Sequence, residues 1–225
     1  QFGKYGDAVE EMDWSVGEIL NAVERLGISD NTFVYFTSDN GAHIDEYGLD
    51  GERHGGYNGI YRGGKTMGGM EGGIRVPTVA MWPGVIPAGL QIDQPTSMMD
   101  ILPTVAHLSG ADLSARLLDG HNLMPLLTNE TQHTDHKVLM HYCGADIHAA
   151  RYSPEDSLDV WKVLFVSPNF LPGTDSCGYI CDCTGDSVII HDPPLLYNIA
   201  TDPSEKEPLD STAPEYADIM QTVNQ

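Results

Sequence analysis

The stretch that decides the fold class is residues 31–41, which read Asn-Thr-Phe-Val-Tyr-Phe-Thr-Ser-Asp-Asn-Gly. A continuous run of β-branched and aromatic side chains is typical of a strand that is covered on both faces. Residues 5–26 precede this run, and their apolar side chains recur at helical spacing up to a stop at Gly27. A helix that leads through a short turn into a buried strand is an α/β unit, so the sequence predicts an α/β fold.

Asp39 and Asn40 follow this strand directly, at its carboxyl end. Open α/β sheets place their ligand sites there, and oxygen ligands of this kind suit calcium or magnesium. The same Asp-Asn-Gly triplet is also an ordinary turn, and the residues alone leave the two interpretations open. Calcium takes about six to eight oxygens, so a metal site here requires further carboxylates from elsewhere.

Residues 41–73 are dense in glycine, which predicts a long loop, and long ordered loops tend to carry function. Residues 59–66 match the phosphate-binding loop of nucleotide hydrolases letter for letter. That mechanism requires a buried strand before the loop and a helix after it, and the flanking sequence is polar and glycine-rich, so we reject it. Lys65 is a candidate for neutralising an anionic substrate group, the alternative being a solvated loop lysine. His43 and His54 are candidate acids or bases, and we expect His54 to be a surface histidine.

Glu71 and Arg75 are four residues apart, which is helical spacing. The two glycines between them disfavour a helix, so we interpret both side chains as loop anchors. Residues 75–82 predict a second strand. A helix is expected to begin with a cap at Asp100, which places Pro103 in its first turn, although Ser97 and Asp100 also have the spacing of a capping box.

Residues 131–225 are expected to form a second unit, after a first unit of residues 1–130. Short apolar segments predict a small antiparallel sheet, and a terminal helix is expected at 214–223. The predicted strands are 137–142, 160–166, 187–190 and 195–199. Three histidines in or near this sheet are expected to be structural: His141, His148 and His191.

Four cysteines lie in the last third of the chain, namely Cys143, Cys177, Cys181 and Cys183. Their even number and clustering favour disulfides and an oxidising compartment, while the Cys-Asp-Cys spacing is poor for zinc. Asn129 begins an Asn-Glu-Thr acceptor for glycosylation, which agrees with a secretory route.

The composition sets further bounds. Eleven basic against 33 acidic residues give a net charge of −22, which excludes a phosphate-backbone partner such as a nucleic acid. Apolar residues make up 41% of the chain, which excludes a disordered acidic tail. No uninterrupted apolar run is long enough to span a membrane. The chain opens on Gln1 without a signal peptide, so we expect a piece of a longer polypeptide.

Five blocks of sequence, read together in this order, resemble the carboxyl-terminal half of the arylsulfatases, and within them the steroid sulfatase branch. The blocks are residues 5–14, 35–43, 63–77, 95–104 and 191–197. The resemblance implies part of an alkaline-phosphatase-like mixed α/β sheet, followed by a small antiparallel sheet with a terminal helix. It also implies the disulfides Cys143–Cys183 and Cys177–Cys181.

The resemblance further implies a calcium-dependent sulfuric ester hydrolase. Asp39 and Asn40 match calcium ligands of the family, although the steroid sulfatase branch often has glutamine in place of Asn40. Lys65 matches the lysine that contacts the sulfate ester, and His43 lies near the site by position. The nucleophile of the family is a formylglycine made from a cysteine in a Cys-x-Pro-x-Arg motif.

This sequence contains no Cys-x-Pro-x-Arg motif, and the first pair of calcium aspartates is also absent. We therefore expect the formylglycine, and any membrane attachment, to belong to a missing amino-terminal part, and the isolated chain to be inactive. The expected partner is a small-molecule or glycan sulfate ester, in the lumen of the endoplasmic reticulum, Golgi or lysosome, or outside the cell. Two alternatives stay open: a phosphatase or phosphodiesterase of the same superfamily, and a catalytically inactive secreted protein.

Overall fold

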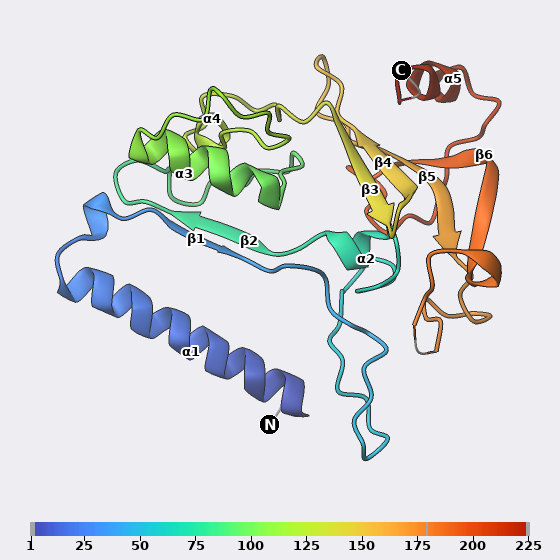
Figure 1. Cartoon of the computed structure of the whole chain (residues 1–225), viewed down its shortest axis with the longest axis horizontal. Helices are drawn as coiled ribbons and strands as arrows, with labels where there is room; N and C mark the ends of the chain where they lie inside the picture. The colour runs from blue at the N-terminus through green and yellow to red at the C-terminus, as the bar shows by residue number, and fades with distance from the viewer. Residues whose placement is uncertain (1–2, 179, 224–225) are drawn as a thin grey trace.

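A computed structural model describes residues 3–178 and 180–223. The chain builds two sheets, a two-stranded one formed by β1 and β2 and a four-stranded one formed by β3 to β6 (Figure 1). Helices α1 and α3 lie on opposite sides of the two-stranded sheet, and α5 lies beside the four-stranded one (Figure 1). The architecture is the α/β fold that the sequence predicts.

The first unit begins with α1 (Gly3–Arg25) and continues through a short turn into β1 (Val34–Thr37), which pairs antiparallel with β2 (Thr78–Met81). The expectation that this strand is covered on both faces is wrong, because all four residues of β1 are half-buried. One face packs against α3 (Ile101–Ser109) and α4 (Met124–Leu127) through a cluster of leucines and aromatic rings. Helix α1 lies on the other side, but none of its described residues is buried.

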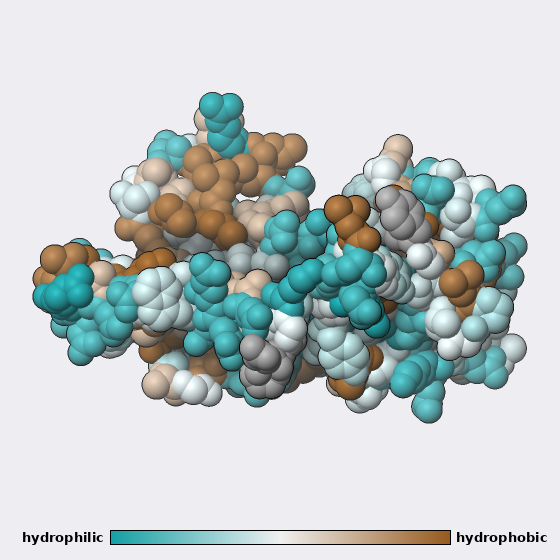
Figure 2. All heavy atoms as spheres, turned by 90° about the horizontal axis from the view of Figure 1, so that it is seen from below, coloured by the Kyte–Doolittle hydropathy of each residue, from teal (hydrophilic) through white to brown (hydrophobic). Residues whose placement is uncertain are grey.

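Apolar side chains of the first unit reach the surface. No residue of α1 is buried, and Trp14 and Ile19 are 66% and 61% exposed. In Figure 2 the hydrophobic colour gathers on the left-hand part of the surface, which this unit forms. The apolar stripe that predicts the helix therefore lacks a partner within the described residues. None of the helices in the described part of the chain is long and apolar enough to cross a membrane.

Helix α3 has Asp100 at its N-cap, as predicted, but the Asp100 side chain caps no amide of α3. Ser97 and Asp100 form a capping box: the Ser97 hydroxyl accepts from the Met99 amide, and the Asp100 carboxylate accepts from the Ser97 amide at 2.7 Å. The box begins a 3-10 turn, Met98–Asp100, which runs directly into α3. Because α3 itself begins at Ile101, Pro103 lies in its first turn, as predicted.

The C-terminal sheet unit, residues 138–223, has strand order β3-β4-β5-β6 with antiparallel pairing throughout. Its strands are β3 (Val138–Cys143), β4 (Asp146–Tyr152), β5 (Trp161–Pro168) and β6 (Val188–Asn198). Strand β4 is absent from the prediction, and β6 joins two predicted strands into one. Helix α5 (Pro214–Val223) lies where it is expected. The disulfides are Cys143–Cys183 and Cys177–Cys181, the pairs that the resemblance implies.

The long glycine-rich loop runs from β1 to the four-residue helix α2 (Glu71–Ile74) within the first unit and packs against the C-terminal sheet unit. At α2, Glu71 and Arg75 approach to 3.8 Å across one turn. The expectation that the glycines exclude a helical pair is wrong, because tertiary contacts hold this turn. Met67 and Met70 just before it are fully buried in a cluster with Ala149 and Leu164 of the C-terminal sheet unit.

Candidate functional site

Asp39 and Asn40 form a tight turn at the carboxyl end of β1. The Asp39 carboxylate accepts from the Asn40 amide at 2.9 Å, and the Ser38 hydroxyl donates to the Asn40 carbonyl at 3.0 Å. The Asn40 side-chain amide donates to the Gly41 carbonyl at 2.9 Å, which turns its oxygen away from that bond. Asp39 is exposed and Asn40 is half-buried. The Asp-Asn-Gly triplet therefore forms an ordinary turn, and the same turn presents side-chain oxygen atoms at its surface.

Two further segments lie against this turn, joined to it by backbone hydrogen bonds. The Lys65 amide donates to the Ala42 carbonyl at 3.1 Å, and the Gly41 amide donates to the Gly73 carbonyl at 2.9 Å. The Gly72 amide donates to the Arg62 carbonyl at 2.7 Å, which closes the arrangement. The fold therefore brings the Asp-Asn turn, the Lys65 loop and α2 together, although 26 positions separate Asp39 from Lys65.

The close approach of these three segments explains the density of glycine. A Cβ on Gly64 would lie 2.5 Å from the Ala42 carbonyl oxygen, and one on Gly73 would lie 2.5 Å from the Gly64 oxygen. A Cβ on Gly41 would fall on the carbonyl oxygen of Gly72. Backbone cannot give way as a flexible side chain can, so these glycines are required by packing. The loop is an ordered stack and not a flexible linker.

Asn58 holds the stack from one side, and the sequence gives little signal for it. Its side-chain oxygen accepts from the Ala42 amide at 2.9 Å, and its nitrogen donates to the Ala42 and Gly63 carbonyls at 3.1 and 2.9 Å. The loop forms no helix or strand here, so the Asn58 side chain provides hydrogen-bond partners for its backbone groups. An asparagine in a polar, glycine-rich stretch is too common for sequence reasoning to single it out.

The oxygen atoms at the turn fit part of a calcium site. A carboxylate and an amide oxygen are the hard ligands that calcium takes, but they are fewer than the six to eight oxygens of a complete shell. Within residues 3–178 and 180–223 no three or more His, Cys, Asp and Glu side chains are grouped closely enough to hold a metal ion. A calcium site at this turn would therefore require further ligands from outside the described residues.

The candidate bases differ in their surroundings. The His43 ring lies 2.7 Å from the Glu46 carboxylate through Nδ1, and its Nε2 is buried without a hydrogen-bond partner in the described structure. His54 contacts Lys4 at 3.1 Å and Asp50 at 3.3 Å, so this loop histidine is half-buried within a cluster of exposed charged side chains. Lys65 itself is exposed.

Glu71 occupies the centre of a buried charge cluster, which corrects its interpretation as a loop anchor. Its carboxylate is fully buried and accepts from Arg151 of β4 and, at 3.0 Å, from Lys162 of β5. Its backbone amide donates to the carboxylate of Glu205 at 2.9 Å, and Lys162 pairs with Glu205 as well. Burial alone would raise the pKa of Glu71, but the charges of Lys162 and Arg151 hold this pKa well below its usual range.

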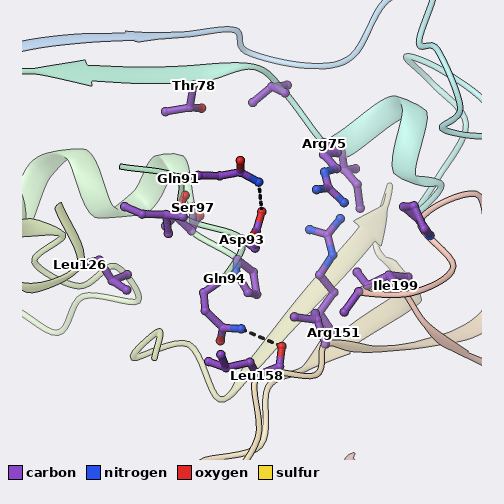
Figure 3. Close-up of a pocket in the computed structure, with 18 of the residues that line it drawn as sticks. Arg75, Thr78, Gln91, Asp93, Gln94, Ser97, Leu126, Arg151, Leu158 and Ile199 are labelled. Carbon is purple, nitrogen blue, oxygen red and sulfur yellow. Dashed lines mark hydrogen bonds between the residues drawn. The ribbon is translucent and has the colours of Figure 1, made fainter. Parts of the chain in front are cut away.

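A cavity of about 750 Å³ opens next to this cluster. In Figure 3 the guanidinium groups of Arg75 and Arg151 point toward one another across it, with Asp93 on the facing wall. Arg75 also lies 4.7 Å from the ring of Tyr61. Neither the Asp-Asn turn nor Lys65 lines this cavity. The predicted site is therefore a surface formed by three loop segments, and its residues lie outside the lining of this cavity.

This surface follows the carboxyl end of a strand, which is the position where open α/β sheets bind their ligands. Residues 1–111 match the model of the sulfatase family, and residues 134–225 match the model for the C-terminal region of aryl-sulfatase. The chain belongs to the sulfatase family.

The relatives place the chain near one branch of that family. It is 51% identical to the steryl-sulfatase of Rattus norvegicus over 99% of its length and 39% of the relative's. It is 53% identical to human arylsulfatase H over 93% of its length and 38% of the relative's, and 37% identical to N-acetylgalactosamine-6-sulfatase of Canis lupus familiaris over 99% and 42%. The chain thus spans about two fifths of the length of these relatives.

Solved structures agree on the fold. The PsFucS1 sulfatase from Pseudoalteromonas sp. superposes with a TM-score of 0.75 at 26% identity, over 96% of this chain and 41% of that one. The structure of Ps i-CgsB in complex with k-i-k-neocarrahexaose superposes with a TM-score of 0.60, also at 26% identity, over 94% and 40%.

Proposed function

We propose that the protein hydrolyses sulfate esters and that residues 1–225 supply one wall of its active site. The observation that carries the proposal is the backbone contact that holds the Lys65 loop against the turn of Asp39 and Asn40. This contact supports the proposal, because it holds the backbone of the Lys65 loop next to the turn that carries the two oxygen-bearing side chains. The identity to relatives named steryl-sulfatase and arylsulfatase favours a steryl or aryl sulfate as substrate.

In this proposal Asp39 and Asn40 hold one calcium ion together with ligands from outside these residues. Bound calcium supplies a Lewis acid that withdraws charge from sulfate oxygens. The Lys65 ammonium binds the ester and stabilises the negative charge that develops on the leaving oxygen. His43, its ring oriented by Glu46, presents Nε2 as a further hydrogen-bonding group. The nucleophile is a formylglycine from a Cys-x-Pro-x-Arg motif outside the 225 residues.

The chain also carries features of a secretory route, which we include in the proposal. All four cysteines are in disulfides, as suits an oxidising lumen or the extracellular space. Asn129, the predicted glycosylation site, is exposed in the turn after α4, where an oligosaccharide can be accommodated.

The test is a single substitution in the full-length protein. Lys65→Ala is expected to lower kcat for an aryl sulfate about a hundredfold or more, since removal of one group that stabilises developing charge costs about 10²–10³ in rate. Lys206→Ala is the matched control, because it removes an exposed lysine from the C-terminal sheet unit. Chelation of calcium followed by its re-addition, in the same assay, checks the metal requirement.

Two results would contradict the proposal. An unchanged kcat in Lys65→Ala would remove Lys65 from the site, and faster turnover of an aryl phosphate than of the matching sulfate would favour the phosphatase alternative. The isolated 225-residue chain is expected to be inactive on both esters, because it lacks the nucleophile.

A further inference from the structure

We propose that Glu71 is a positioning residue, through which the C-terminal sheet unit fixes the Lys65 loop against the Asp39–Asn40 turn. The significance for catalysis rests on the proposed function, whereas the mechanical coupling does not. Among the contacts of the described residues, the Glu71 side chain pairs with Arg75, Arg151 and Lys162 and with none of Asp39, Asn40, Lys65 and His43, so it acts through the backbone that it anchors.

The first step of the argument is that three separate segments of the C-terminal sheet unit hold Glu71. Arg151 comes from β4 and Lys162 from β5, and Glu205 follows β6. Lys162 and Glu205, like Glu71 itself, are completely buried, and Arg151 is 9% exposed. Arg151 and Lys162 both donate to Oε1 of Glu71, and the Glu71 amide donates to Glu205. A displacement of Glu71 therefore breaks charge-assisted hydrogen bonds in a dry environment.

The second step is that α2 has no stability of its own. A helix of four residues is below the length at which helices persist, and Gly72 and Gly73 make up half of it. Its position is therefore set from outside, by Glu71 and by the burial of Met67 and Met70 against the C-terminal sheet unit.

The third step leads from α2 to the candidate site. Gly72 and Gly73 lie directly against the backbone of Arg62, Gly64 and Gly41, with no space for a Cβ at either position. Contacts this close are rigid, so a shift of α2 displaces the Lys65 loop, the turn that begins at Asp39, or both. Positions in a reactive site tolerate little displacement, since about 1 Å can cost about a hundredfold in rate.

Three further side-chain hydrogen bonds tie the same loop to the C-terminal sheet unit. The Arg62 guanidinium donates to the Asp175 carboxylate at 3.1 Å and to the Glu205 carbonyl at 3.0 Å. The Ser176 hydroxyl donates to the Asp45 carboxylate at 2.7 Å. Glu205 therefore holds both ends of the segment between Arg62 and Glu71.

The experiment compares two glycine-to-alanine changes in the full-length protein. Gly72→Ala forces a Cβ onto the carbonyl oxygens of Gly63 and Arg62, whereas Gly17→Ala in α1 meets nothing within 4 Å. Gly72→Ala is expected to lower kcat for an aryl sulfate about a hundredfold and to raise the amide hydrogen exchange of residues 62–73. Exchange in β4 and β5 should stay protected, and Gly17→Ala should match the wild type.

Glu71 is tested by a conservative pair, Glu71→Gln and Glu71→Asp. Glu71→Gln should reduce both thermal stability and kcat, because it leaves Lys162 and Arg151 short of a negative charge. Glu71→Asp restores the charge but shortens the reach by one methylene. It should therefore recover much of the melting temperature while kcat stays lowered, a separation that a purely structural role does not produce.

Unchanged exchange of residues 62–73 in Gly72→Ala would overturn the coupling, whatever the activity. Full recovery of kcat together with stability in Glu71→Asp would overturn the positioning role. If Glu71→Gln does not fold, the results for Gly72→Ala and Glu71→Asp decide between the proposal and a purely structural role. A wild-type protein without sulfatase activity would contradict the proposed function alone, because the exchange experiment requires no substrate.

Discussion

At the scale of single residues, the most instructive side chains are ionisable groups that the fold buries. His141 of β3 lies beside the Glu71 cluster, and burial together with the positive charges of Arg151 and Lys162 lowers its pKa to about 3. Glu71 has a lowered pKa and Glu205 a pKa raised by burial, so the stability contributions of these two carboxylates depend on pH in opposite directions. From the sequence, His141 is expected to be structural, and its surroundings explain why it stays uncharged.

The lowered pKa of His141 predicts a loss of stability in mild acid. The unfolded chain binds a proton at this histidine as the pH falls through 6.5, while the folded protein does not, so the free energy of unfolding decreases down to about pH 3. At pH 5 the loss relative to pH 7 is about 2 kcal/mol, at about 1.4 kcal/mol per pH unit. His141→Gln should remove this part of the pH dependence, as measured by urea unfolding at both pH values.

The exposed His107 of α3 provides the control. His107→Gln should keep the pH dependence of the wild type. Equal slopes for the two variants would show that another group causes the loss.

At the scale of elements, α3 shows how much a local motif determines. The spacing of Ser97 and Asp100 contains a capping box, and the structure forms it. Strand β4 shows the opposite case. Its centre, Ala149 and Ala150, has little intrinsic preference for a strand, yet both alanines are fully buried, and Gly69 of the long loop approaches Ala149 closely. The packing of the surrounding segments requires small side chains at these positions. A local sequence pattern does not reveal this requirement.

The capping box predicts a measurable contribution to stability. Ser97→Ala removes the acceptor for the Met99 amide and should lower the free energy of unfolding by about 1 kcal/mol, as loss of an N-cap usually does. Ser114→Ala, in an exposed loop, should change it by less than about 0.5 kcal/mol. Denaturant unfolding measures both, and equal effects would show that the box is energetically neutral.

At the scale of the whole molecule, the C-terminal sheet unit is the part that supports the candidate site. It places two of the eleven basic residues of a chain with net charge −22 in a buried cluster around Glu71 of the first unit. The disulfides stabilise this unit to different extents. Cys143–Cys183 closes a separation of 40 residues across the unit, while Cys177–Cys181 closes one of four.

The two disulfides should therefore contribute unequally. In the loop-entropy description, replacing both cysteines of Cys143–Cys183 by alanine should cost about 4 kcal/mol, and the same change at Cys177–Cys181 about 2 kcal/mol. Urea unfolding of the two double variants measures the difference. A larger loss for the shorter loop would mean that packing of Cys181, which is 4% exposed, outweighs chain entropy.

The α/β class, the helices α1 and α5, most strands and the candidates Asp39, Asn40 and Lys65 could be predicted from the sequence, because hydrophobic periodicity and short motifs are local properties. Three features could be recognised only in the folded chain: Asn58 holds the loop, Glu71 is the centre of a buried charge cluster, and the glycines form a packed stack. These features depend on segments as distant as Glu71 and Glu205, and whether two such segments meet is decided by how the whole chain packs.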